Sequence, residues 1–299
     1  MTRQGVKGLG LAIVLMLSGA CTTVVEMDSN TSIGTSSASE QSASRHDNKR
    51  DKQKEAAQTY VQLGLAYLRQ GERQRARLNL LKAVEKDKRS GDAQNALALL
   101  FQMEDEPGLA EEHFKNAIRY EPEQTRFRYN YGLFLLWQKR YEDAFDEFTI
   151  ASEDINYERR AQVFYSLGLI AKRLGRTDEA KVAWEKAIKL NPQLAGPFLD
   201  LAEIYFQLGD YPKSKRYLEH FDKLSKPSPR ALWLEVRLEH VFGNKDAEAS
   251  KALALRNMFP YAKETIEYKA WVKAQKDGVE NLFSGSKDTL EYKDLQQAP

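Results

Sequence analysis

The chain has 299 residues, which is enough for one large domain or two ordinary ones. Lys plus Arg number 45 and Asp plus Glu number 43, so the net charge is only +2. A protein that binds nucleic acid through its charge needs a basic excess, and this chain has none. The chain has one cysteine, Cys21, which excludes an intramolecular disulfide.

The first residues have the order of a secretion signal. Arg3 and Lys7 precede a short apolar run, Leu9–Leu17, and three small residues then lead directly to Cys21. The apolar run is too short to cross a bilayer, since a spanning helix needs about 20 residues. An ordinary signal peptide, or a chance free cysteine, would give a similar pattern.

The run LSGAC, ending at Cys21, resembles the lipobox of bacterial lipoproteins. The resemblance implies a lipoprotein signal peptide over residues 1–20 and lipidation of Cys21, with a palmitate chain as the membrane anchor. Thr22 follows the cysteine, where an Asp would resemble the signal for inner-membrane retention. The resemblance therefore implies a lipid-anchored protein on the periplasmic face of the outer membrane.

Residues 21–52 are rich in Ser, Thr and Ala and contain almost no large apolar side chain. Such a segment buries too little surface to offset the entropy lost on ordering. We expect a flexible polar tether, with an r.m.s. reach of roughly 30 Å for about 30 residues of coil.

The clearest structural unit covers residues 161–192 and predicts two amphipathic helices joined by a tight turn. Gly168 lies where a second helix must come close. Gly175 ends the first helix, because glycine accepts the left-handed conformation after a helix C-terminus. Thr177 is a candidate N-cap for the second helix, and Trp184 lies on its apolar stripe.

This unit recurs along the chain at a regular interval. The residues equivalent to Gly168, which we call anchors, are Gly64, Ala98, Gly132, Gly168, Ala202 and Val236. Consecutive anchors are equally spaced except for one interval, which is longer by two residues that fall in the loop 155–160.

Each anchor is followed by the same sequence features. The small–large–small set Ala180, Trp184 and Ala187, which follows Gly168, has counterparts after most of the other anchors. Glycine recurs at the place of Gly175 in four of the six units: Gly71, Gly175, Gly209 and Gly243. The recurrence therefore includes both the helices and the turn between them.

The pattern resembles the tetratricopeptide repeat, a helix–turn–helix unit with a period of about 34 residues. The resemblance implies an all-α fold over residues 53–275, a right-handed superhelical solenoid of about six helix hairpins. Residues 261–275 are predicted to form a C-terminal capping helix, with Ile266, Ala270 and Trp271 on one side. Residues 276–299 have no sustained period and are expected to be a mobile tail.

No motif indicates catalysis. The four histidines are far apart in the sequence, and outside the signal segment there is no glycine-rich phosphate loop and no nucleophile motif. Paired acids such as Asp143 and Glu147 fit the solvated face of a helix. We therefore expect no enzyme, no metal site, no cofactor and no small-molecule substrate.

The expected function is protein binding. In tetratricopeptide arrays the first helix of each hairpin lines a groove, and the helical period places positions −3, +1, +4 and +5 from each anchor there. In the first three repeats these positions are mostly apolar: Val61, Leu65, Leu68, Leu99, Met103, Tyr129, Leu133, Leu136 and Trp137. Such a groove suits an amphipathic helix or an extended peptide, with Tyr129 and Trp137 as its strongest aromatic contacts. Each of these residues could instead belong to the core between repeats.

A lipobox, a polar tether and about six such repeats together resemble the PilF/PilW family of type IV pilus biogenesis lipoproteins, the pilotins. The run RNMFPYAKETIEY, residues 256–268, is similar to the closing motif of that family. The resemblance implies a non-enzymatic factor that binds the pilus secretin subunit and promotes its localisation and multimerisation in the outer membrane. Two alternatives stay open: a lipoprotein scaffold for β-barrel assembly or cell-wall enzyme complexes, and a cell-wall hydrolase that carries repeats.

Overall fold

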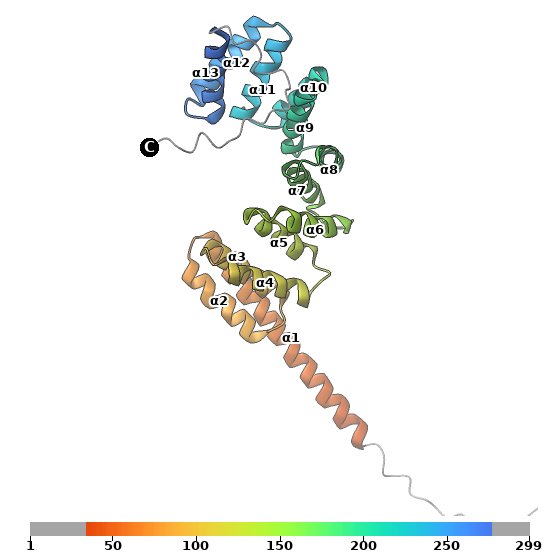
Figure 1. The fold of residues 1–299 in the computed structure, drawn as a ribbon. Helices are drawn as coiled ribbons and strands as arrows, with labels where there is room; N and C mark the ends of the chain where they lie inside the picture. The colour runs from red at the N-terminus through yellow and green to blue at the C-terminus, as the bar shows by residue number, and fades with distance from the viewer. Residues whose placement is uncertain (1–33, 277–299) are drawn as a thin grey trace, which may run out of the picture. The chain divides into compact units, whose positions relative to one another are not determined.

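The computed structural model of the chain describes residues 34–276, and these residues form thirteen helices and no strand. The signal segment, Cys21 and the tail beyond residue 276 lie outside the described residues. The chain divides between Lys52 and Gln53 into two units, and all of the repeats lie in the second. The helices, labelled in Figure 1, are α1 (Gly34–Arg69), α2 (Arg73–Lys86), α3 (Gly91–Met103), α4 (Pro107–Tyr120), α5 (Thr125–Trp137), α6 (Tyr141–Glu153), α7 (Arg160–Arg173), α8 (Thr177–Leu190), α9 (Ala195–Gln207), α10 (Tyr211–Leu224), α11 (Pro229–Val241), α12 (Lys245–Met258) and α13 (Lys263–Lys276).

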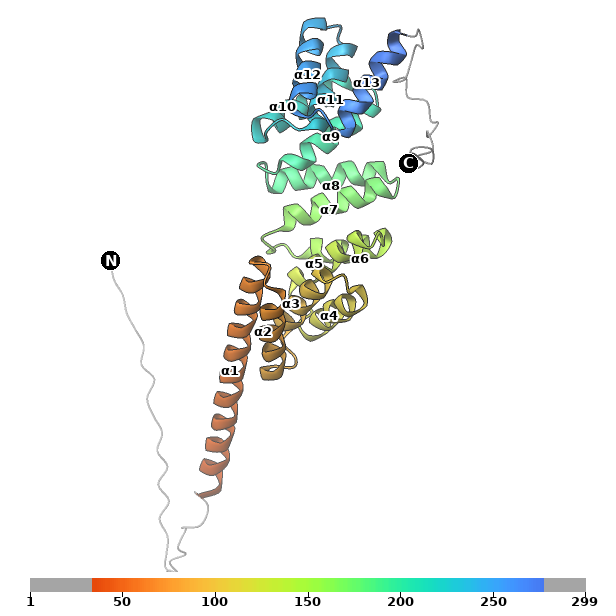
Figure 2. The same ribbon diagram turned by 90° about the vertical axis from the view of Figure 1, so that its left-hand side faces the viewer.

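The helices pair in chain order as six hairpins, from α1 with α2 to α11 with α12, and α13 follows the last hairpin (Figure 2). We call the first helix of each hairpin its A helix and the second its B helix. The predicted all-α array of tetratricopeptide hairpins is confirmed. The A helix of the first hairpin is the C-terminal part of α1, which shares an apolar core with α2 and α3.

Five of the six hairpins pair a small anchor on the A helix with a larger residue on the B helix. The anchors are buried in every repeat, and so are the B-helix residues at the place of Trp184: Leu80, Phe114, Phe148, Trp184, Leu218 and Ala252. In the sixth hairpin the sizes are exchanged, with Val236 on the A helix and Ala252 on the B helix. The period read from the sequence is therefore the period of the core.

The Gly168–Trp184 contact shows why the anchor must be small. A methyl group placed on Gly168 would lie 2.2 Å from the indole nitrogen of Trp184. That Nε1–H donates a hydrogen bond of 3.1 Å to the carbonyl of Tyr165, which holds the fully buried ring against the A helix. The first hairpin has the same constraint, because a methyl group placed on Gly64 would lie 2.5 Å from the side chain of Leu80.

The turn within each hairpin places one residue in the left-handed region. Four repeats use glycine there, and Gly175 has a φ of +75°. The second and third repeats use Asp105 and Lys139, each with a φ of +60°. Lys139 lies in the same hydrogen-bonded turn as the glycines, since its N–H bonds the carbonyl of Leu136 and the next N–H bonds that of Leu135. The turn geometry is the same in every repeat, although the residue in the left-handed conformation is glycine in only four of them.

The single longer spacing also has a local cause. The connection between α6 and α7 runs over residues 154–159, whereas the one between α4 and α5 runs over residues 121–124. The two extra residues predicted near 155–160 are therefore accommodated in a loop, which leaves the packing of the helices unchanged.

Helix α1 begins much earlier than the predicted end of the tether. We expected flexible coil over residues 21–52, whereas residues 34–52 form the N-terminal part of α1. Between Thr35 and Leu63 the sequence has no glycine or proline to interrupt a helix. Residues 48–55 are exposed, so this part of the helix depends on its own hydrogen bonds and propensity and not on packing.

Two local predictions are wrong. Thr177 is the first residue of α8 and not its cap, because Arg176 occupies the N-cap position and makes no side-chain capping bond. Helix α13 forms as a cap over the last hairpin, but Ile266 and Ala270 face solvent. Its buried face carries Thr265 and Trp271, since Trp271 packs against the core of α11 and α12.

Glu111 on α4 links the second and third hairpins. Its carboxylate accepts hydrogen bonds from Arg140 at 2.8 Å and from the hydroxyl of Tyr131 at 2.9 Å, and Lys115 lies 2.7 Å away. Burial opposes the charged form of Glu111, but these donors outweigh it and lower the pKa of the carboxyl from 4.5 to about 2. Glu111 is therefore ionised throughout the neutral range.

We predict that Gly168→Ala destabilises the protein by about 2 kcal/mol, because the new methyl group forces Trp184 out of its site. Urea unfolding followed by circular dichroism measures the change. The matched control is Gly108→Ala, because a methyl group at Gly108 meets nothing within 4 Å. Equal effects of the two substitutions would show that the anchor contact does not limit the packing.

We predict opposite effects from exchanging residues at equivalent turns. Lys139→Gly should stabilise the protein by about 1 kcal/mol, since it removes the cost of a left-handed lysine. Gly175→Ala should destabilise it by about the same amount. Thermal unfolding of both variants tests this, and a loss of stability in Lys139→Gly would contradict the account of the turn.

We predict that Glu111→Gln lowers the free energy of unfolding at pH 7 and that the difference from the natural chain shrinks in acid. The lowered pKa means that the ionised carboxylate contributes stability above about pH 4.5, and that this contribution is lost as the pH falls to about 2. Urea unfolding between pH 7 and pH 2 measures it. Glu112→Gln, on the neighbouring residue, is the control, and its effect should be small at every pH.

Candidate functional site

The nine residues predicted to line a groove have three different environments. Val61, Leu68 and Tyr129 are buried, so they are core residues and present little surface. The ring of Tyr129 packs 5.6 Å from Phe148 and 6.0 Å from Tyr157, which explains its burial. Three more pack against the core at its edge: Leu65, Leu99 and Leu136.

The remaining three form a surface that we call the A-helix patch, made of Met103, Leu133 and Trp137. They are 43%, 38% and 50% exposed, so each presents apolar surface to solvent. Leu133 and Trp137 are one turn apart on α5, and Met103 occupies on α3 the position that Trp137 occupies on α5. The patch therefore continues from the second repeat to the third.

Beyond the third repeat the A-helix face becomes charged. Arg230 on α11 pairs with Asp200 at 2.8 Å and with Glu203 at 2.7 Å, both on α9. Lys172 on α7 pairs with the same Glu203 at 3.3 Å. From α7 onward this face therefore carries charged side chains beside its apolar ones.

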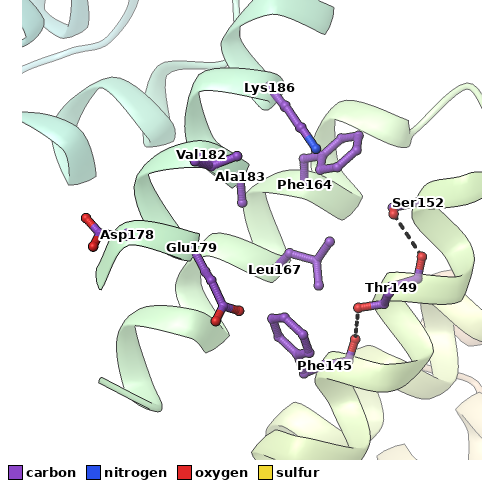
Figure 3. Close-up of a pocket in the computed structure, with 10 residues that line it drawn as sticks. All are labelled: Phe145, Thr149, Ser152, Phe164, Leu167, Asp178, Glu179, Val182, Ala183 and Lys186. Carbon is purple, nitrogen blue, oxygen red and sulfur yellow. Dashed lines mark hydrogen bonds between the residues drawn. The ribbon is translucent and has the colours of Figure 1, made fainter. Parts of the chain in front are cut away.

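The opposite side of the array carries a hollow that we call the B-helix pocket. It has a volume of about 400 Å³ and lies between α6 and α8, with α7 beneath it (Figure 3). Its lining residues are Phe145, Thr149, Ser152, Phe164, Leu167, Asp178, Glu179, Val182, Ala183 and Lys186.

The interior of the B-helix pocket is apolar. The hydroxyl of Thr149 donates to the carbonyl of Phe145, and the hydroxyl of Ser152 donates to that of Thr149, both at 2.8 Å (Figure 3). Because both hydroxyls donate to carbonyls of their own helix, their hydrogens are not available to a ligand, although their oxygens can still accept. Lys186 extends along the ring of Phe164, with its nitrogen 5.2 Å from the ring centre. The pocket suits an apolar side chain better than a polar group.

The sequence projection missed the B-helix pocket because it considered only A helices. The available signal was Val182, an apolar residue on the otherwise polar face of α8, and it is 51% exposed. A second hollow, of about 420 Å³, lies between α4 and α6 and is lined mainly by charged side chains, among them Arg140 and Asp143. The spaces between consecutive B helices are therefore not uniform in chemistry.

Residues 34–276 contain no group of three or more His, Cys, Asp or Glu side chains placed to hold a metal ion. Within the same residues no helix is both long and apolar enough to cross a bilayer.

Comparison with protein families identifies the repeats. Tetratricopeptide repeat signatures match residues 57–88, 100–156, 161–194 and 196–227. The chain is 37% identical over 216 residues to the type IV pilus assembly protein PilF of Pseudomonas aeruginosa, which covers 72% of this chain and 86% of that protein.

Comparison with solved structures also relates the chain to PilF. A structure from the functional characterisation of Pseudomonas aeruginosa PilF superposes with a TM-score of 0.69 at 36% identity, over 74% of this chain and 99% of that one. PilW, a type IV pilus biogenesis factor, superposes with a TM-score of 0.61 over 70% of this chain and 96% of its own, and at 21% identity it shows the shared fold alone. The chain therefore belongs to the tetratricopeptide repeat family of type IV pilus assembly proteins that includes PilF.

Proposed function

We propose that the protein is a non-enzymatic pilotin: an adaptor that binds the subunit of the type IV pilus secretin and promotes its localisation and multimerisation in the outer membrane. The main support is the relationship to PilF, which extends over 216 residues, or 72% of this chain. PilF is a type IV pilus assembly protein, and the repeats present side chains for contacts with other proteins. Both facts favour an adaptor over an enzyme.

The proposed contact surface is the A-helix patch. Exposed Trp137 and Leu133 offer an aromatic and an aliphatic anchor on one rigid helix, and residues of this kind contribute most of the binding energy at protein interfaces. The contact would extend onto the half-buried side chains at the edge of the core, Leu65, Leu99 and Leu136. An apolar segment of the secretin, either a helix or an extended chain, fits such a surface.

The proposed membrane attachment is a lipid on Cys21, after removal of residues 1–20. It rests on the resemblance of the N-terminal sequence to a lipobox. A lipid anchor would hold the repeats at the periplasmic face of the outer membrane, and the bound secretin segment would then be concentrated near the bilayer. Growth with a radioactive palmitate label would test the anchor, since Cys21→Ser should remove all label from the protein.

The alternative is a scaffold of the same architecture for β-barrel assembly or cell-wall enzyme complexes. The B-helix pocket supports this alternative, because it offers a second apolar site that the proposed secretin contact does not use. Purification of the protein from outer membranes, followed by identification of its partners by mass spectrometry, separates the two functions.

Deletion of the gene tests the proposal in the cell. We expect loss of secretin multimers from the outer membrane and loss of surface pili, with both restored by the natural gene. Normal multimers in the deletion strain would overturn the pilotin function, whatever partners are found by purification.

We predict that Trp137→Ala weakens binding to the purified secretin at least tenfold, because it removes the largest exposed side chain of the A-helix patch. Its helix content and unfolding should be nearly unchanged. The matched control is Ile150→Ala, which removes a similarly exposed apolar side chain, 45% exposed, from B helix α6. If Trp137→Ala instead abolishes cooperative unfolding, Trp137 is a core residue and the proposed patch is wrong.

A further inference from the structure

Arg237 lies on the A-helix face of the sixth repeat, one residue after the anchor Val236. This is the position that Leu133 occupies in the third repeat. The guanidinium carbon of Arg237 lies 4.7 Å from the ring centre of Phe206 on α9 and 5.2 Å from that of Trp233 on α11. The cation is therefore held between aromatic rings from two consecutive repeats.

The rings that hold Arg237 are themselves fixed. Phe206 is 8% and Trp233 is 5% exposed. Trp233 packs edge-on against Trp271 of α13, with ring centres 5.7 Å apart. An arginine stacked between fixed rings loses less conformational freedom on binding than an arginine that moves in solvent.

Arg237 forms no ion pair with any residue that the structure describes. Its Nε–H reaches only the carbonyl of Trp233, at 3.4 Å, which is a weak hydrogen bond. The two carboxylates whose charges act on Arg237 already have partners: Glu203 pairs with Arg230 and Lys172, and Glu267 pairs with Lys263. The Nη groups of Arg237 thus remain available.

Burial without an ion pair makes Arg237 different from the other arginines on this face. Arg230 is neutralised by two carboxylates, and Arg173 lies exposed in solvent. Burial lowers the pKa of the Arg237 guanidinium, and Glu203 and Glu267 oppose the shift, but an arginine stays charged at any physiological pH. A partly desolvated cation gains more from a carboxylate than a cation in water does.

We propose that Arg237 is a binding site for the carboxylate of an Asp or Glu side chain in a partner protein segment that lies along the A-helix face of the fifth and sixth repeats. The guanidinium would donate from its Nη groups to the carboxylate, while the rings of Phe206 and Trp233 keep it in place. This site is separate from the A-helix patch on α3 and α5. It does not require that the partner is the secretin.

The test uses a library of random short peptides displayed on phage and selected on the full chain. Selection on the natural chain should enrich peptides that share an Asp or Glu at one position. The enriched peptides should bind Arg237→Gln about tenfold more weakly than the natural chain. Replacing the shared acid by its amide should cost the natural chain a similar factor and cost Arg237→Gln nothing.

Two further variants keep the result interpretable. Arg173→Gln removes an exposed cation from the same face and should leave peptide binding unchanged. Arg237→Lys keeps the charge but not the planar group, and it should bind the peptides with intermediate affinity. Thermal unfolding of every variant separates a lost contact from a lost fold.

Three results would overturn the proposal. The first is enrichment of the same peptides on Arg237→Gln as on the natural chain. The second is an equal loss of binding in Arg173→Gln, which would indicate a general effect of charge. The third is that selection on the natural chain enriches no acidic position.

Discussion

The structure depends on a close contact between one buried residue of each A helix and one of the following B helix, with the smaller residue on the A helix in five hairpins and on the B helix in the sixth. At Gly168 no side chain larger than hydrogen fits beside the indole of Trp184. This close approach lets two short helices bury a common face that neither could bury alone. Because the contact recurs at a nearly constant spacing, every hairpin presents its A and B helices in the same way.

The repeated geometry leaves the surface free to differ from one repeat to the next. The same A-helix positions carry exposed Leu133 and Trp137 in the third repeat and charged Glu203 and Arg237 in the fifth and sixth. Since the backbone is equivalent at these positions, the chemistry of the face is set by side chains alone. A long partner segment could thus meet apolar contacts at one end and a cation at the other.

The sequence alone was sufficient to predict the repeats and the four glycine turns, because each depends on residues close together in one hairpin, and it also predicted a helix after the last hairpin. Burial of individual face residues was not predictable. Tyr129 and Trp137 share one helix and one chemical class, yet Tyr129 is enclosed by Phe148 and Tyr157 while Trp137 is half exposed. The difference arises from the neighbouring hairpin, which the helical period does not describe.

Other features were missed for different physical reasons. Lys139 adopts the left-handed conformation because the hydrogen bonds of the turn impose it, against the residue's own preference. Residues 34–52 form a helix although they have almost no apolar side chain to bury, so a prediction based on burial could not find it. The B-helix pocket depends on the spacing between two hairpins, which is a tertiary property.

The central claim is that the A-helix patch is the surface that binds the secretin. Placing a photo-crosslinking amino acid at position 137 or at position 182, in living cells, tests it most directly. Position 137 lies in the A-helix patch and position 182 lines the B-helix pocket. Irradiation should link position 137 to the secretin subunit and leave position 182 without a secretin adduct. Secretin adducts at position 182 and none at position 137 would contradict the account.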